Sequence, residues 1–136
     1  MNTVVSVLRG ERMLPDLQAA HWLLRIALAA FIMHQGFLKA PISVDEAASF
    51  GVPVLLWVAA ALGELAAGLA LIAGGFLQTR LGDLITRVGG ATLALIVASV
   101  VVVVYWAPPM DLFLGNQFHL LLLVGGLYFA LRGNAA

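Results

Sequence analysis

The chain has 136 residues and a net charge of zero, with seven Lys and Arg balanced by seven Asp and Glu. It is 62% hydrophobic and 10% charged, whereas soluble globular chains are roughly 45–50% apolar and about 25% charged. Ten per cent charge is too little to cover a soluble domain of this size, and a neutral chain gives no reason to expect nucleic acid as a partner. The lack of cysteine excludes disulfides and thiolate metal sites. The composition predicts a one-domain integral membrane protein.

The first segment, residues 1–18, has a short apolar run that precedes its arginines. A secretory signal peptide has the opposite order, with its positive charges first. We therefore expect this segment to be retained as an interfacial or flexible arm.

Four apolar stretches follow. A helix needs roughly 20 residues to cross a bilayer, and these stretches are read as candidate spans. They are about Ala19–Leu38, Val54–Leu77, Leu84–Trp106 and the shorter Phe118–Leu131. Pro108 and Pro109 are expected to keep the third connection free of helix. Because short connections make neighbouring helices antiparallel, the sequence predicts an all-α, membrane-embedded, antiparallel four-helix bundle over residues 19–132, with a tail at 133–136.

The positive side chains predict the orientation of the bundle. One side of the membrane would carry Arg9, Arg12, Arg80, Arg87 and Arg132. The first connection has only Lys39, and the third has no Lys or Arg. Both termini are therefore expected to be cytoplasmic, in a multi-pass protein of the inner (plasma) membrane.

Four ionisable residues fall inside the predicted spans: Arg25, His34, Glu64 and His119. Each costs about 2.5–3.5 kcal/mol on insertion, so each is expected to have a partner or a function. With Lys39 and Pro53 taken as the outer boundary, His34 lies ~7 Å deep, Arg25 ~21 Å and Glu64 ~16 Å. Nine residues separate Arg25 from His34, which places them on opposite sides of a helix.

Two structural interpretations are open for Arg25. It pairs with Glu64, ~5 Å away in depth, or its long stem carries the charge to the cytoplasmic surface.

The functional interpretation places a pocket in the outer half of the bundle. Its members would be His34, Lys39, Glu64, Asn116, Gln117 and His119. An imidazole beside a buried carboxylate, with a lysine at the mouth, can donate protons or hydrogen bonds to a quinone-like carbonyl. A metal or haem site on His34 and His119 is the less favoured alternative, because two histidines without a spaced motif are weak evidence.

Several motifs resemble the DoxX family of small four-helix membrane proteins. They are "RIALAAFIMHQGFLKA" with its H-x-G-x-x-K, "GELAAGLALIAGGFLQTRLGD" with its E-x-x-x-G and Thr-Arg, and "GNQF". The likeness runs from about Leu24 to Leu131, whereas the chain ends in "RGNAA" in place of the Ser-x-Asp that often ends the family. By position, the resemblance marks Arg25, His34, Gly36, Lys39, Glu64, Gly68, Arg80 and Asn116.

The resemblance implies a redox or quinone-linked membrane subunit that works with a partner protein. In that reading Glu64 and His34 carry the chemistry, with Glu64 as proton carrier. Lys39, His119, Asn116 and Gln117 bind the ligand, and Arg25, Gly36, Gly68 and Arg80 are structural. The chain itself carries no nucleotide or metal motif, so whether it is an enzyme stays open; if it is, an oxidoreductase subunit is expected.

Quinone is the one cofactor that the pocket hypothesis allows; no metal site is expected and haem is disfavoured. The expected partners are the lipid bilayer, other membrane or redox subunits or a second copy of the chain, and no nucleic acid. The alternative function is a non-catalytic accessory subunit packed against a larger membrane complex, motivated by the many glycines that allow close helix approach. Small-molecule transport is less favoured, because four helices leave a narrow bundle.

Overall fold

The computed structural model describes residues 18–134, so the predicted arm at residues 1–17 and the last two residues lie outside it. The described chain is helical and contains no strand, which confirms the all-α prediction. Its elements are the short η1 (Gln18–Ala20), α2 (His21–Leu38), α3 (Val44–Ser49), α4 (Val54–Phe76), α5 (Arg80–Val103), α6 (Pro109–Gly115) and α7 (Gln117–Arg132).

The four long helices fall where the apolar stretches predicted them, and the largest difference is the start of α5. This helix begins at Arg80, four residues before the predicted Leu84. The Thr79 side chain caps it by accepting a hydrogen bond of 3.2 Å from the Gly82 N–H. The capping residue, and not the end of the apolar run, sets this boundary.

Two short helices occupy connections that the sequence analysis left without structure. The α3 helix is capped by Ser43, which accepts from the Glu46 N–H at 3.3 Å. The α6 helix begins at Pro109, so the prediction that Pro108 and Pro109 prevent helix there is wrong. Proline is tolerated in the first helical turn, where its missing N–H has no intrahelical acceptor.

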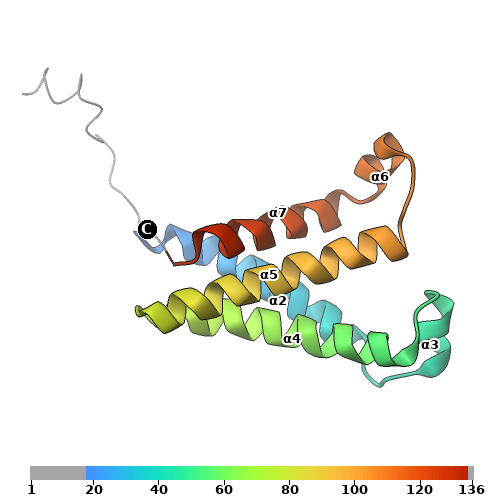
Figure 1. Cartoon of the computed structure of the whole chain (residues 1–136), viewed down its shortest axis with the longest axis horizontal. Helices are drawn as coiled ribbons and strands as arrows, with labels where there is room; N and C mark the ends of the chain where they lie inside the picture. Colours follow the sequence, from blue (N-terminus) through green and yellow to red (C-terminus); the bar gives the residue numbers. More distant parts are fainter. Residues whose placement is uncertain (1–17, 135–136) are drawn as a thin grey trace, which may run out of the picture.

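Neighbouring long helices run in opposite directions (Figure 1). Contacts between α2 and α4 occur in reverse order along the two helices, since Gly36 approaches Ala61 and Gly68 approaches Ala29. Helix α4 packs against both α2 and α5, and α7 packs mainly against α5. The connections containing α3 and α6 lie at one end of the molecule, whereas the described C-terminus lies at the other, near the start of α2 (Figure 1).

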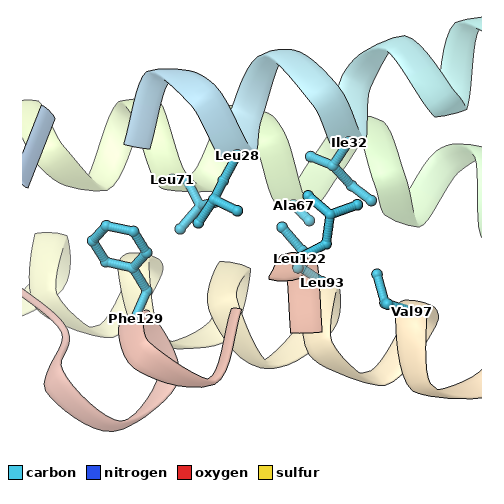
Figure 2. Close-up of a cluster of buried hydrophobic side chains, with 8 residues drawn as sticks. All are labelled: Leu28, Ile32, Ala67, Leu71, Leu93, Val97, Leu122 and Phe129. Carbon is cyan, nitrogen blue, oxygen red and sulfur yellow. The ribbon is translucent and has the colours of Figure 1, made fainter. Parts of the chain in front are cut away.

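The apolar core draws on all four long helices (Figure 2). Its buried members are Leu28, Ile32, Ala67, Leu71, Leu93, Val97, Leu122 and Phe129. Helices α5 and α7 cross closely at Gly90 and Gly126, where a Cβ added to Gly90 would lie 2.6 Å from the Gly126 carbonyl oxygen. A side chain at either position would force the two helices apart.

Two helices within residues 18–134, α4 and α5, are long and apolar enough to cross a membrane. The bent pair α6–α7, with 87° between its two parts, would add a third if it counts as one span. Many large apolar side chains on the outer faces of α4 and α5 are exposed, among them Leu55, Leu62, Leu69, Leu95 and Val103. Such faces are suited to contact with lipid.

Candidate functional site

A cavity of about 610 Å³ lies at the end of the molecule that carries α3 and α6. All four long helices contribute to its wall, together with the segment that joins α3 to α4. Most of the wall is apolar, formed by residues such as Ile32, Leu56, Val97 and Leu122. A few polar side chains interrupt it: Gln35, Lys39, Glu64, Ser99, Tyr105 and His119.

An ion pair between Lys39 and Glu64 is the main polar feature of this wall. Lys39 Nζ lies 2.8 Å from Glu64 Oε2 and 3.0 Å from Oε1, and it also donates to the Gln35 carbonyl at 3.2 Å. The two side chains are 11% and 5% exposed. Two charges so far removed from water need each other, since either one alone would be strongly destabilising.

The end of α2 and its close contact with α4 place Lys39 beside Glu64. Lys39 follows the last residue of α2, where the partial negative charge of the helix C-terminus favours a cation. Gly36 is buried against α4, and a Cβ there would lie 3.0 Å from the Ala61 carbonyl oxygen. Since Ala61 lies one turn from Glu64, this close contact sets Lys39 within reach of the carboxylate.

The position of Lys39 corrects the depths expected from the sequence. Helix α4 continues seven residues outward from Ala61 to Val54, whereas α2 ends two residues after Gly36. The start of α4 therefore extends several ångströms beyond the end of α2. Lys39 and Pro53 do not lie at one level, and the lysine lies in the cavity wall beside Glu64.

Two aromatic rings adjoin the ion pair. Lys39 Nζ lies 5.1 Å from the centroid of the Trp57 ring, a cation–π contact. Phe50, next to α3, stacks on Trp57 with 5.2 Å between ring centroids and 20° between planes. The buried indole N–H of Trp57 finds no hydrogen-bond partner within residues 18–134, which is rare because a buried unsatisfied donor costs about 1–3 kcal/mol.

His119 contributes to the cavity wall from α7. Its half-buried ring lies 5.0 Å from the Tyr105 ring, which follows α5. The structure thus brings three of the six expected pocket residues, Lys39, Glu64 and His119, around one cavity.

The other three expected pocket residues, His34, Asn116 and Gln117, do not line the cavity. His34 is exposed, and the reason is its angular position: Ile32 and Gly36, two residues to either side, are both buried. Two residues correspond to about 200° around a helix, so His34 points away from the core. Gln117 is exposed at the start of α7.

Asn116 is buried, and its side chain donates to the Leu112 carbonyl at 3.1 Å. Because Leu112 belongs to α6, this hydrogen bond satisfies a carbonyl near the end of that helix.

Of the residues expected to be structural, two glycines are buried between helices and one arginine is exposed. Gly36 and Gly68 are buried at the contact of α2 with α4, and a Cβ on Gly68 would lie 3.2 Å from the Ala29 carbonyl oxygen. Arg80 is exposed at the first position of α5.

Arg25 does not pair with Glu64, and it does not extend to the surface, since it is 1% exposed. Its guanidinium donates to the Leu71 carbonyl at 2.6 Å, to Thr86 Oγ1 at 3.1 Å and to His21 Nδ1 at 3.0 Å. It also donates to Asn134 Oδ1. Arg25 therefore joins α2 to α4, α5 and the C-terminal tail, at the end opposite the cavity.

The C-terminal tail makes hydrogen bonds to α4 and α5 that the sequence did not indicate. Asn134 Nδ2 donates to the Gly74 carbonyl at 2.7 Å, and the Asn134 backbone N–H donates to Asp83 Oδ1 at 2.7 Å. Asp83 in turn accepts from Arg87 Nε at 2.8 Å. A residue two places before the chain end carries no periodic pattern, so no sequence signal pointed to Asn134.

The place of Trp57 in the cavity wall could have been inferred from its spacing in the sequence. It precedes Glu64 by seven residues, two helical turns, and therefore shares its face of α4. Ala61 and Gly68 complete this buried face.

Within residues 18–134, no group of three or more His, Asp or Glu side chains could hold a metal ion. Comparisons of the chain with protein-family models, curated proteins and solved structures find no match.

Proposed function

We propose that the chain is a DoxX-like, four-span subunit of the bacterial inner membrane that binds a quinone-like molecule in the cavity. In this proposal α2, α4, α5 and α7 all cross the bilayer and both termini lie in the cytoplasm. The observation that carries it is the buried Lys39–Glu64 pair in the wall of an otherwise apolar cavity. A volume of about 610 Å³ falls within the roughly 300–1,000 Å³ of small-molecule sites.

The chemistry of the wall favours a flat ring with carbonyl oxygens. The three ammonium hydrogens of Lys39 have acceptors in both Glu64 oxygens and the Gln35 carbonyl. A ligand carbonyl would replace the longer contact, 3.0 Å to Glu64 Oε1, while the ion pair through Oε2 persists. Phe50 and Trp57 offer aromatic surface beside the ion pair.

The proton and electron roles follow from the residues present. Lys39 and His119 would donate hydrogen bonds to the two carbonyl oxygens, and Glu64 would exchange a proton with the ring when its charge changes. In this proposal the electrons come from a redox partner protein. His34, which the sequence placed in this chemistry, takes no part in the proposed site because it faces outward.

Tryptophan fluorescence tests the binding directly. The chain has three tryptophans, so a variant with Trp22→Phe and Trp106→Phe reports from Trp57 alone. We expect saturable quenching of this variant by dimethoxy-methyl-benzoquinone in lipid nanodiscs. Adding Lys39→Met should weaken it about tenfold, because a charge-assisted hydrogen bond is worth roughly 1.5–3 kcal/mol.

The matched control reports from the other end of the molecule. Trp22 packs against Phe76 with 4.7 Å between ring centroids, beside Arg25 and far from the cavity. A variant with Trp57→Phe and Trp106→Phe should therefore show only weak, non-saturating quenching. Equal quenching of both single-tryptophan variants, or none in either, would contradict quinone binding.

One observation favours a second function, that of a non-catalytic accessory subunit. Lys39 and Glu64 satisfy each other without a ligand, and Arg25 is held by hydrogen bonds to α4 and α5. Purification in mild detergent separates the two functions. An accessory subunit should be recovered with a larger membrane complex and show no saturable quenching, whereas a solitary monomer or homodimer argues against it.

A further inference from the structure

The wall of the cavity continues from the core to the outer surface of the molecule. Glu64 and Val97, each 3% exposed, lie at its inner part. The same cavity is lined by Leu56 of α4 and by Leu95 and Val103 of α5, which are 58%, 68% and 63% exposed. The space beside the ion pair is therefore open sideways, along the groove between α4 and α5.

The packing of α4 against α5 explains where this opening begins. A Cβ added to Gly63 would lie 2.8 Å from Ile96 Cδ1, and one added to Gly89 would lie 2.8 Å from the Ala70 Cβ. At these levels the two helices are in close contact. One turn outward from Gly63, the small residues Ala59 and Ser99 line the cavity, and here the helices leave a gap.

The lip of the opening is apolar. Ser99, its one hydroxyl residue, donates to the Leu95 carbonyl of its own helix at 2.7 Å. The remaining lip side chains are aliphatic, including Leu56, Ala59, Leu95 and Val103. Hydrocarbon can occupy such a groove without leaving a polar group unsatisfied.

The opening lies between the two helices that are long and apolar enough to cross a membrane. A groove on their outer surface faces lipid, whereas the inner part of the cavity holds the Lys39–Glu64 pair. A molecule that fits both parts has a polar ring at one end and a hydrocarbon chain at the other.

We infer that the site takes a lipid-soluble ligand that enters sideways from the bilayer, and that its hydrocarbon chain leaves through the groove between Ala59 and Ser99. This inference rests on the proposed function, since it assigns a chain to the molecule whose ring lies beside Lys39. It adds the access route and the class of ligand: a ring that carries a long apolar chain.

Two probes and a matched pair of substitutions test the groove. The probes are decylubiquinone and dimethoxy-methyl-benzoquinone, which is the same ring without the chain. Ala59→Phe fills the groove, whereas Ala66→Phe adds the same bulk two turns away on the same face of α4, at an exposed position outside the cavity wall. Binding is read from Trp57 quenching in the variant lacking Trp22 and Trp106.

We expect Ala59→Phe to weaken binding of decylubiquinone about tenfold or more, the usual size of a steric misfit in a packed site. Binding of the ring without the chain should stay within about twofold, and Ala66→Phe should leave both probes unchanged. Ser99→Phe, on the α5 side of the groove, should reproduce the effect of Ala59→Phe.

The outcomes separate the inference from the function on which it rests. If Ala59→Phe and Ser99→Phe weaken both probes equally, or neither probe, the chain does not leave between α4 and α5 and the inference is wrong. If neither probe quenches Trp57 in the parent variant, the proposed function fails, and the inference fails with it.

Discussion

A cation lies in the interior at each end of the molecule, and the surroundings of the two cations differ. Arg25 lies among hydrogen-bond acceptors from α2, α4, α5 and the tail, and the Phe129 ring lies 4.7 Å from its guanidinium carbon. Lys39 is held by one carboxylate and one carbonyl, beside a cavity of about 610 Å³. One end is closed by packing, and the other has room for another molecule.

The difference suggests how structural and functional polar residues can be told apart in this chain. Besides His21 of its own helix, Arg25 has acceptors on α4, α5 and the C-terminal tail, so the guanidinium holds α2 to these three segments. The Lys39–Glu64 pair joins only α2 and α4, and open space separates it from α5 and α7. Substitutions at the Arg25 end should therefore act on stability alone, whereas those at the cavity end should also act on binding.

The largest effect is expected from Arg25→Met. It removes four hydrogen bonds, each worth roughly 0.6–1.7 kcal/mol in membrane proteins, so the free energy of unfolding should fall by about 2–7 kcal/mol. Unfolding in mixed micelles, followed by circular dichroism, measures the loss. The matched control is Arg80→Met, which makes the same change at an exposed position and should stay within about 0.5 kcal/mol. Equal stability of the two variants would show that the Arg25 network does not hold the helices together.

A smaller effect on the free energy of unfolding is expected from substitutions in the Lys39–Glu64 ion pair. Lys39→Met leaves Glu64 as a buried charge without its counter-ion, so it should destabilise more than the double variant Lys39→Met with Glu64→Gln, which removes both charges. The double-mutant cycle should give a coupling of about 0.5–3 kcal/mol. Additive single effects in that cycle would mean that the 2.8 Å contact contributes nothing to stability.

The same contrast shows how far the sequence could predict this molecule. Apolar length predicted the four long helices within a few residues, because burial in lipid or core requires continuous runs. The azimuth argument correctly placed Arg25 and His34 on opposite faces, but it could not decide which face was buried. Lys39 reaches Glu64 because the start of α4 extends beyond the end of α2. This offset depends on the packing of Gly36 against α4 and not on a local sequence pattern. Asn134 lies in the tail, where no periodicity constrains its partners.

The smallest effect is expected from His34→Ala, which tests whether the cavity end has the boundary described here. His34 is exposed on α2, outside the cavity wall, so its removal should change the free energy of unfolding by less than about 0.5 kcal/mol. His119→Ala is the paired substitution, because the half-buried ring of His119 lies in the wall. It should weaken Trp57 quenching by dimethoxy-methyl-benzoquinone about three- to tenfold, the loss of one hydrogen bond, while His34→Ala leaves it unchanged. If His34→Ala weakens quenching and His119→Ala does not, the ligand lies on the outer face of α2, and the cavity is not the binding site.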